Sequence, residues 1–263
     1  MNLKNCRFQG KMKRLIAKML NRAGYVVFNT RSPYGYARDG LFTMNNDHFR
    51  RDEAFRAAYA RGVEASRGYD PKMEWRVHVA LWAASTASRA PGDFVECGVN
   101  AGFMSSAIMR SLDWRHSGKQ FYLIDTFSGP VLSQYSRQEI DGGRAANAES
   151  ALAAGAYVTD LERVRANFSE WPNAVVVQGT VPDVLDTLSV GNVAFLHLDM
   201  NCALPEKAAL EFFWGRLSPG GVVLLDDYTY FGNESQTEAI DSVSARLGFK
   251  TLSLPTGQGL IVK

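Results

Sequence analysis

The chain has 263 residues, of which 46% are hydrophobic and 21% charged, so it can bury a full core like an ordinary globular protein. Its formal net charge of +2 at pH 7 is too small to favour nucleic acid as the main partner. No apolar run reaches the roughly 18 residues that a membrane-spanning helix needs, and residues 1–22 lack a signal-peptide pattern. The three cysteines have no zinc-site or redox spacing, which favours a reduced, cytoplasmic setting.

The first seventy residues differ from the rest and predict a helical extension over 1–70, followed by a main domain over 71–263. Seven basic and no acidic side chains lie between Lys4 and Arg22. Apolar residues recur there at helical spacing, which predicts a basic amphipathic helix over residues 1–22. This helix fits two roles: packing on its own domain or on another subunit of a homo-oligomer, or peripheral contact with an anionic membrane.

Helix and strand patterns then alternate along the chain. Helices are expected over 50–67 and 74–88. Short apolar runs typical of strands covered on both faces follow at 94–97, 121–125, 175–178, 194–199 and 222–226. Capping boxes at Thr159 and Ser235 predict two helix starts, and the chain ends in a predicted β-hairpin. We therefore expect an α/β fold with a doubly wound, mostly parallel sheet.

The strongest polar signals follow the ends of these strands, where open α/β sheets bind ligands. The first is the stretch from Glu96 to Gly102, in which Gly98 and Gly102 allow backbone to approach a ligand closely. It contains neither a dinucleotide fingerprint nor a phosphate loop, which argues against a nucleotide-dependent dehydrogenase. The alternative is that both glycines serve the turn alone.

Asp125 ends the next strand, a little over twenty residues beyond the glycine turn, where an acid commonly accepts hydrogen bonds from ribose hydroxyls. The alternative is that it caps the following turn.

Three further acids form a second signal. Asp199 ends a later strand, and Asp226 with Asp227 ends its expected neighbour. Three converging carboxylates repel each other unless a cation or protons compensate, and hard oxygen ligands suit Mg²⁺. The alternative is that one aspartate caps a helix and another faces solvent.

Two nearby residues receive structural interpretations. His197 precedes Asp199 by two residues and is expected behind the site rather than as the catalytic base. Cys97 has no basic neighbour in the sequence that would activate a thiol, so it is expected to pack.

Four segments, 96–102, 125–129, 198–199 and 219–228, together resemble the macrocin O-methyltransferase family. The resemblance implies a class I, Rossmann-like fold that binds S-adenosyl-L-methionine and methylates a hydroxyl of a sugar or glycoside. It places Glu96, Gly98, Asn100 and Gly102 at the methionine part of the cofactor and Asp125 at its ribose, with Thr126 and Phe127 as further cofactor-binding residues. It makes Asp199, Asp226 and Asp227 the ligands of a Mg²⁺ ion, and we expect Asp199 to be the general base.

Two segments depart from the expected pattern. Met200–Glu206 lacks the second acid and the tyrosine that antibiotic-pathway members usually carry, which leaves the acceptor open. Ser133–Ala148 is polar and contains Gly142 and Gly143, so it predicts either a hinged lid or a surface excursion. Besides sugar methylation, a non-sugar acceptor and a cofactor-binding protein without catalysis remain alternatives.

Overall fold

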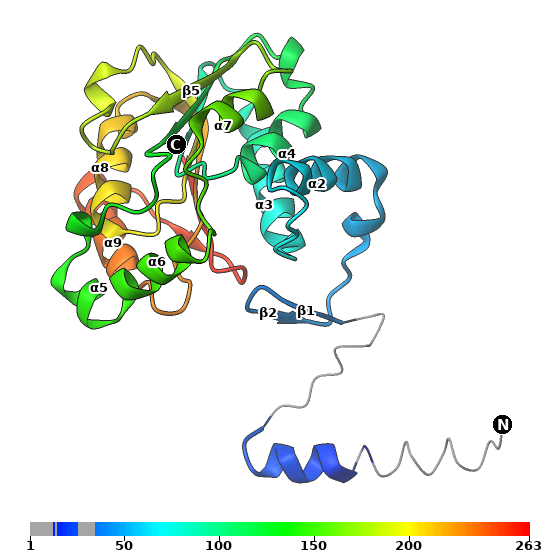
Figure 1. Cartoon of the computed structure of the whole chain (residues 1–263). Coiled ribbons are helices and arrows are strands. Elements are labelled where there is room, and N and C mark those ends of the chain that lie inside the picture. The colour runs from blue at the N-terminus through cyan, green and yellow to red at the C-terminus, as the bar shows by residue number, and fades with distance from the viewer. Residues whose placement is uncertain (1–12, 14, 26–34) are drawn as a thin grey trace. The chain divides into compact units, whose positions relative to one another are not determined.

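The computed structural model describes residues 13, 15–25 and 35–263, and the chain forms two compact units, residues 1–47 and 48–263 (Figure 1). In the first unit a helix covers residues 15–22, and β1 (Tyr36–Arg38) pairs with β2 (Leu41–Thr43) in an antiparallel hairpin. Asp39 and Gly40 turn the chain with φ of 50° and 71°, a combination that favours two-residue hairpins. The sequence analysis did not predict this hairpin. Residues 1–12 and 14 of the expected helix lie outside the described residues.

The second unit is built on a seven-stranded sheet with strand order β5-β4-β3-β6-β7-β9-β8. Its first five strands in that order are parallel, and the last two are antiparallel. The strands are β3 (Asp93–Cys97), β4 (Phe121–Asp125), β5 (Ala174–Gln178), β6 (Val193–Leu198), β7 (Leu217–Leu225), β8 (Leu252–Ser253) and β9 (Gly259–Val262). The doubly wound, mostly parallel sheet and the terminal hairpin are confirmed.

Helices cover both faces of the sheet, and the alternation of side chains along each strand explains why (Figure 1). Phe94, Phe195 and Leu224 belong to the core beneath α2 (Glu53–Ala65), α3 (Glu74–Ala87), α4 (Phe103–Ser111) and α7 (Leu161–Asn167). Their neighbours Val95, Leu196 and Leu225 belong to the opposite core, beneath α8 (Ala203–Trp214) and α9 (Glu234–Leu247). Because α2 packs against α4, the expected boundary at residue 70 falls inside the second unit.

Both predicted capping boxes are wrong. Helix α7 is capped by Asp160, whose carboxylate accepts a hydrogen bond from Arg163 N at 3.1 Å, and Asn233 precedes α9. An aspartate next to Thr159 competes successfully for the cap, since the two residue types have similar capping strength. Two short helices not foreseen, α5 (Arg137–Asp141) and α6 (Arg144–Ala153), lie between β4 and β5.

The chain runs outward from β3 to β4 and β5, and then returns to place β6 on the other side of β3. In a doubly wound sheet this reversal opens a crevice at the carboxyl ends of the two central strands. The turn after β3 and the residue after β6 are therefore brought side by side. Among the described residues, no helix combines the length and the apolar character needed to cross a membrane.

Candidate active site

An open cleft lies at the carboxyl ends of β3, β4, β5 and β6. In open α/β sheets ligands bind at this place. One wall is formed by the turn after β3, another by the loops after β4 and β5, and a third by the residues after β6. Its lining includes Gly98, Asn100, Asp125, Thr126, Gly129, Pro130, Val131, Gln134, Tyr135, Tyr157, Gly179, Thr180, Asp199, Met200, Asn201 and Cys202.

Gly98 joins two walls of the cleft through its backbone. Its φ of 91° is a left-handed value, and a Cβ placed there would lie 1.9 Å from the carbonyl oxygen of Asp199. Only glycine fits a position that combines this φ with so close an approach. The glycine turn therefore fixes the distance between the expected cofactor wall and Asp199.

Asp125 binds the backbone of the glycine turn. Its Oδ2 accepts hydrogen bonds from the amides of Val99 and Asn100, both at 2.8 Å, and its Oδ1 accepts one from Phe127 N at 2.8 Å. The carboxylate thus holds the turns after β3 and β4 together, and this is the turn-capping alternative from the sequence. Asp125 also lines the cleft, so its contact with a ribose stays a prediction.

The structure separates the expected cofactor-binding residues into two groups. Gly98, Asn100, Asp125 and Thr126 line the cleft. Glu96, Gly102 and Phe127 are not part of its lining. Glu96 is buried beside His197, Gly102 precedes α4 with φ 86°, and Phe127 is buried with φ 45°.

Sequence reasoning missed other residues of the cleft. Gly179 and Thr180 directly follow β5, so the rule that ligands gather at strand ends could have found them. Tyr157 lies in the loop between α6 and α7, and no strand pattern points to it.

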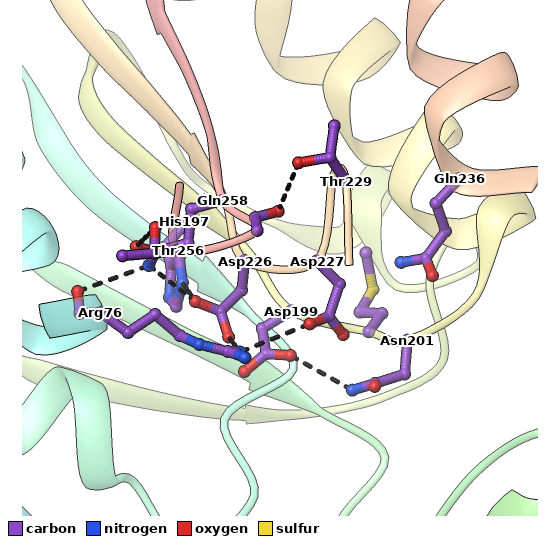
Figure 2. Close-up of polar contacts among 12 residues, drawn as sticks. Arg76, His197, Asp199, Asn201, Asp226, Asp227, Thr229, Gln236, Thr256 and Gln258 are labelled. Atoms are coloured by element: carbon purple, nitrogen blue, oxygen red, sulfur yellow. Dashed lines mark hydrogen bonds and ion pairs between the residues drawn. The ribbon is translucent and has the colours of Figure 1, made fainter. Parts of the chain in front are cut away.

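The three expected metal ligands lie in different surroundings (Figure 2). Asp226 is buried, and Arg76 Nη1 donates to its Oδ2 at 2.6 Å while Gln258 Nε2 donates to its Oδ1 at 2.9 Å. Asp227 is 3.4 Å from the same Arg76 nitrogen. Asp199 is half-buried, and its Oδ1 accepts a hydrogen bond from Asn201 at 3.2 Å.

His197 lies behind the carboxylates and outside the cleft lining. Glu96 and His197 occupy the same register position on β3 and β6, and His197 Nδ1 is 2.9 Å from Glu96 Oε1. Its Nε2 is 3.7 Å from Asp226 Oδ1. Burial alone would lower the pKa of His197, but these two carboxylates raise it to about 10, so the imidazole carries a positive charge at neutral pH.

The surroundings shift the pKa values of Asp199 and Asp226 in opposite directions. Burial raises the pKa of Asp199 well above its usual range, and the charges of Asp226 and Asp227 raise it further. Burial also acts to raise the pKa of Asp226, but Arg76 and His197 more than offset it and hold that pKa well below its usual range. Asp226 is therefore a fixed anion, whereas Asp199 has a high affinity for a proton or another cation.

Ser133–Ala148 lies beside the cleft and is joined to α8. Helix α5 begins with a capping box between Ser136 and Glu139. The same Glu139 carboxylate accepts a hydrogen bond from Ala203 N at 2.9 Å, in the first turn of α8. Gln134 and Tyr135 line the cleft, and Gly143, with φ 80°, separates α5 from α6. Only the start of the segment lines the cleft, so its role as a lid stays a prediction.

Arg144, on α6, reaches the Asp199 wall and donates a hydrogen bond to the carbonyl oxygen of Asn201 at 3.3 Å.

The cleft and its four motif segments agree with a match of residues 77–246 to the macrocin-O-methyltransferase (TylF) family. The chain belongs to the macrocin-O-methyltransferase family. The matched residues include β3 to β7 and the aspartates after β6 and β7, so the family match covers every wall of the cleft.

This chain is also similar in sequence to a protein of Streptomyces olivaceus, 8-demethyl-8-(2,3-dimethoxy-alpha-L-rhamnosyl)-tetracenomycin-C 4'-O-methyltransferase. It is 31% identical over 148 residues, which are 54% of this chain and 55% of that protein. The match thus spans about half of the relative's length.

Two solved structures share the fold of this macrocin-O-methyltransferase family member. The O-methyltransferase NovP superposes with a TM-score of 0.61 at 19% identity, over 72% of this chain and 79% of NovP. The calicheamicin methyltransferase CalS11 superposes with a TM-score of 0.55 at 15% identity, over 88% of this chain and 98% of CalS11. At these identities the likeness shows the class I methyltransferase architecture.

Proposed function

We propose that this chain is an S-adenosylmethionine-dependent O-methyltransferase that acts on a hydroxyl of a sugar or glycoside. Family membership and the Streptomyces relative, which methylates a rhamnosyl-bearing compound by its name, support the reaction class. The observation that carries the proposal is the shared cleft. The glycine turn and Asp125 lie on one wall, and Asp199 lies within van der Waals reach of that turn on another.

The donor side of the cleft would hold S-adenosylmethionine through backbone and polar groups at the ends of β3, β4 and β5. In this proposal Gly98 would leave room for the methionine part, Asp125 and Thr126 would contact the ribose, and Gly179 and Thr180 would contact the base; all five line the cleft. When bound, the cofactor supplies a methyl group already activated on a sulfonium. The chain's own work is therefore to align the acceptor and to take its proton.

Asp199 is the group that we propose as the base. An alcohol is a far weaker acid than a carboxylic acid, so an ordinary aspartate takes its proton poorly. Burial and the neighbouring charges raise the pKa of Asp199, which narrows this gap. The hydrogen bond from Asn201 holds the carboxylate in place at the cleft.

The fit of a Mg²⁺ ion differs among the three aspartates. Both oxygens of Asp226 already face Arg76, Gln258 and His197, so Asp226 does not fit a ligand role. Among the described residues, no group of three or more acid, histidine or cysteine side chains forms a metal site. Asp199 and Asp227 remain as oxygen ligands, and Mg²⁺ commonly binds through one or two carboxylates together with substrate and water.

We therefore propose Asp199 and Asp227 as the residues that would hold Mg²⁺, with Asp226 excluded from the set expected from the sequence. When bound, the ion would lower the pKa of an acceptor hydroxyl next to it. The raised pKa of Asp199, caused by burial and by the charges of Asp226 and Asp227 and only partly offset by His197 and Arg76, supports a cation at this place.

Titration calorimetry with S-adenosylmethionine, followed by methyl-transfer assays on a sugar panel that begins with methyl α-L-rhamnoside, tests the proposal. We expect the wild type to bind the cofactor and to methylate a panel sugar. Asp199→Asn should lower kcat by about 10²–10⁴-fold while the cofactor Kd stays unchanged, because the base acts on the acceptor.

Chelation should lower the wild-type rate, and added Mg²⁺ should restore it. If methyl transfer proceeds at the full rate in the presence of a chelator, the metal role is wrong, and only the role of Asp199 as the base remains proposed. Cofactor binding without transfer to any sugar would favour either a non-sugar acceptor or a binding protein without catalysis, and a panel of phenols and other alcohols separates these two.

A further inference from the structure

Asn100 lines the cleft, and its side chain binds a loop that is distant in the sequence. Its Nδ2 donates a hydrogen bond to the carbonyl oxygen of Ala156 at 3.0 Å, and its Oδ1 accepts one from Val158 N at 2.8 Å. The whole amide of Asn100 is thus matched to the backbone on both sides of Tyr157. Its left-handed φ of 49° is tolerated by asparagine better than by most residues. The side chain of Asn100 therefore acts as a clamp on the 156–158 loop.

The residue held between these two hydrogen bonds faces the cleft. Tyr157 lines it together with Asp199 and is half-buried. Burial raises the pKa of its phenol, and the charge of Asp199 raises it further, so the hydroxyl stays neutral and can donate a hydrogen bond. Asn201, which follows Asp199, lines the same cleft, and its carbonyl oxygen accepts the hydrogen bond from Arg144.

Other tyrosines of the second unit show what a structural hydroxyl looks like here. Tyr228 donates to Asp241 at 2.6 Å, Tyr59 donates to Asp70 at 2.6 Å, and Tyr122 donates to the carbonyl oxygen of Ser189 at 3.1 Å. Tyr157 instead lines the cleft, on a loop whose backbone is held by the Asn100 side chain.

We propose that Tyr157 is an acceptor-binding residue, which donates its hydroxyl proton in a hydrogen bond to a sugar oxygen beside Asp199, and that Asn100 positions it. This inference rests on the proposed methyl transfer to a sugar. It also gives Asn100 a role different from the cofactor contact that the family resemblance implies. Asn100 acts through the loop, so its loss should affect the acceptor and leave the cofactor in place.

A double-mutant cycle with Tyr157→Phe and Asn100→Ala tests the proposal. Methyl α-L-rhamnoside, or the first panel sugar that the wild type methylates, is titrated in the presence of S-adenosylhomocysteine. The KM for the same sugar is measured in parallel. Each single variant should weaken the acceptor Kd and KM by about tenfold, the size of one hydrogen bond, and leave the cofactor Kd unchanged. The double variant should be no weaker than the worse single variant, because both changes remove one contact.

Two further variants separate positioning from general damage. Tyr122→Phe removes a tyrosine hydroxyl bonded far from the cleft lining, and it should leave acceptor affinity unchanged. Asn100→Asp keeps an acceptor for Val158 N but loses the donor to Ala156, so it should recover part of the affinity lost in Asn100→Ala. Backbone amide hydrogen exchange of residues 156–158 should be faster in Asn100→Ala than in the wild type, and intermediate in Asn100→Asp. This measurement does not require an active enzyme.

An unchanged acceptor affinity in Tyr157→Phe overturns the acceptor contact. Additive effects in the double variant, or a weaker cofactor Kd in Asn100→Ala, overturn the positioning role. A wild type that binds cofactor but neither binds nor methylates a sugar contradicts the proposed function and this inference together. Sugar methylation with normal Tyr157→Phe binding contradicts only the inference.

Discussion

Asp226 and Asp199 carry the same side chain on neighbouring strand ends, and their surroundings give them different chemistry. Asp226 faces two positive groups, Arg76 and His197, and is buried with them. A buried carboxylate paired in this way is a structural anion, because removing it takes one anionic partner from each of Arg76 and His197, whose other anionic partners include Asp227 and Glu96, respectively. Asp199 faces the negative side of the same cluster and the cleft. The two aspartates therefore differ in that both oxygens of Asp226 have charged or polar partners within the protein, whereas Asp199 lines the cleft.

Asp226→Asn should consequently lower the free energy of unfolding by about 3–5 kcal/mol, the cost of breaking a buried ion pair from one side. Asp199→Asn should be stability-neutral or slightly stabilising, since it removes a repelled charge. Urea denaturation of both variants measures the contrast. Equal losses in the two variants would show that Asp199 is as structural as Asp226.

Glu206 is a second buried carboxylate and sits on α8 behind the cleft. It accepts hydrogen bonds from Met200 N at 3.1 Å and Gln236 Nε2 at 2.8 Å. Burial raises its pKa from 4.5 to about 8, and the charge of Asp227 acts in the same direction. Folding therefore favours the protonated form. The resulting stability is fully present below the unfolded-state pKa of 4.5 and is lost as the pH rises to about 8.

The stabilising effect of Glu206 on the midpoint temperature of unfolding should therefore decrease as the pH rises from 4.5 to 8. Glu206→Gln should remove this pH dependence. Glutamine keeps an oxygen for Met200 N and has no charge to bury. Differential scanning calorimetry of the wild type and the variant across this range gives the test. A constant difference between the two across the range would contradict the raised pKa.

At the scale of elements, the segment from Ser133 to Ala148 has a small apolar cluster of its own and a hydrogen bond that joins it to α8. Tyr135, Ala148 and Cys202 form a separate apolar cluster beneath it. Glu139 joins α5 to the start of α8, and Gly142 and Gly143 interrupt the helices. A segment with few core contacts and a glycine joint can open locally at low cost.

Limited proteolysis should therefore cut near Gly142 and Gly143 in the free protein and more slowly with cofactor and acceptor bound. Glu139→Gln weakens the bond to Ala203 and should increase cleavage without ligands. Mass spectrometry of the fragments locates the cuts. The same cleavage rate with and without ligands would identify the segment as a surface excursion.

The sequence predicts the sheet well because each central strand contains a short, mostly apolar run that ends at or just before an acid or a glycine. β3, β4, β5, β6 and β7 all fall within a few residues of their predicted positions. The carboxylate cluster also follows from the sequence, since neighbouring parallel strands end at one edge. Helix starts were less predictable, because Asp160 and Asn233 lie next to other residues that cap equally well.

The partners of the site residues could not be predicted in the same way. Arg76 lies 150 residues before Asp226, and nothing local to α3 indicates that its side chain reaches the end of β7. Tyr157 lies in a loop whose position depends on Asn100, 58 residues before Val158. Such contacts depend on how helices and loops pack on the sheet, which a strand pattern does not contain.

At the scale of the whole molecule, charge is divided between the two units. Residues 1–47 contain nine of the 29 Lys and Arg residues and two of the 27 Asp and Glu residues, a formal charge of +7. Residues 48–263 consequently have a formal charge of −5. On the helix over residues 15–22, Leu15, Ile16, Met19 and Leu20 are exposed. A basic helix with exposed apolar side chains has the character of an interfacial helix.

The intact chain should therefore co-sediment with anionic vesicles at low salt and be released at high salt, and a variant lacking residues 1–25 should stay in solution. Replacing Leu15, Ile16 and Met19 by serine tests the apolar contribution at constant charge. Absence of co-sedimentation, together with a changed oligomeric state on deletion, would instead support packing between subunits.

The contact between Gly98 and the Asp199 carbonyl also limits how the proposed methyltransferase could change its substrate. The proposed donor and acceptor sides of the cleft meet through main chain, so their separation does not depend on any side chain that could be exchanged. The lid, the 156–158 loop and Asn201 lie outside this contact and can vary while the reaction axis stays fixed. Engineering for new acceptors should therefore begin at these three places, and libraries that include position 98 should return mostly inactive clones.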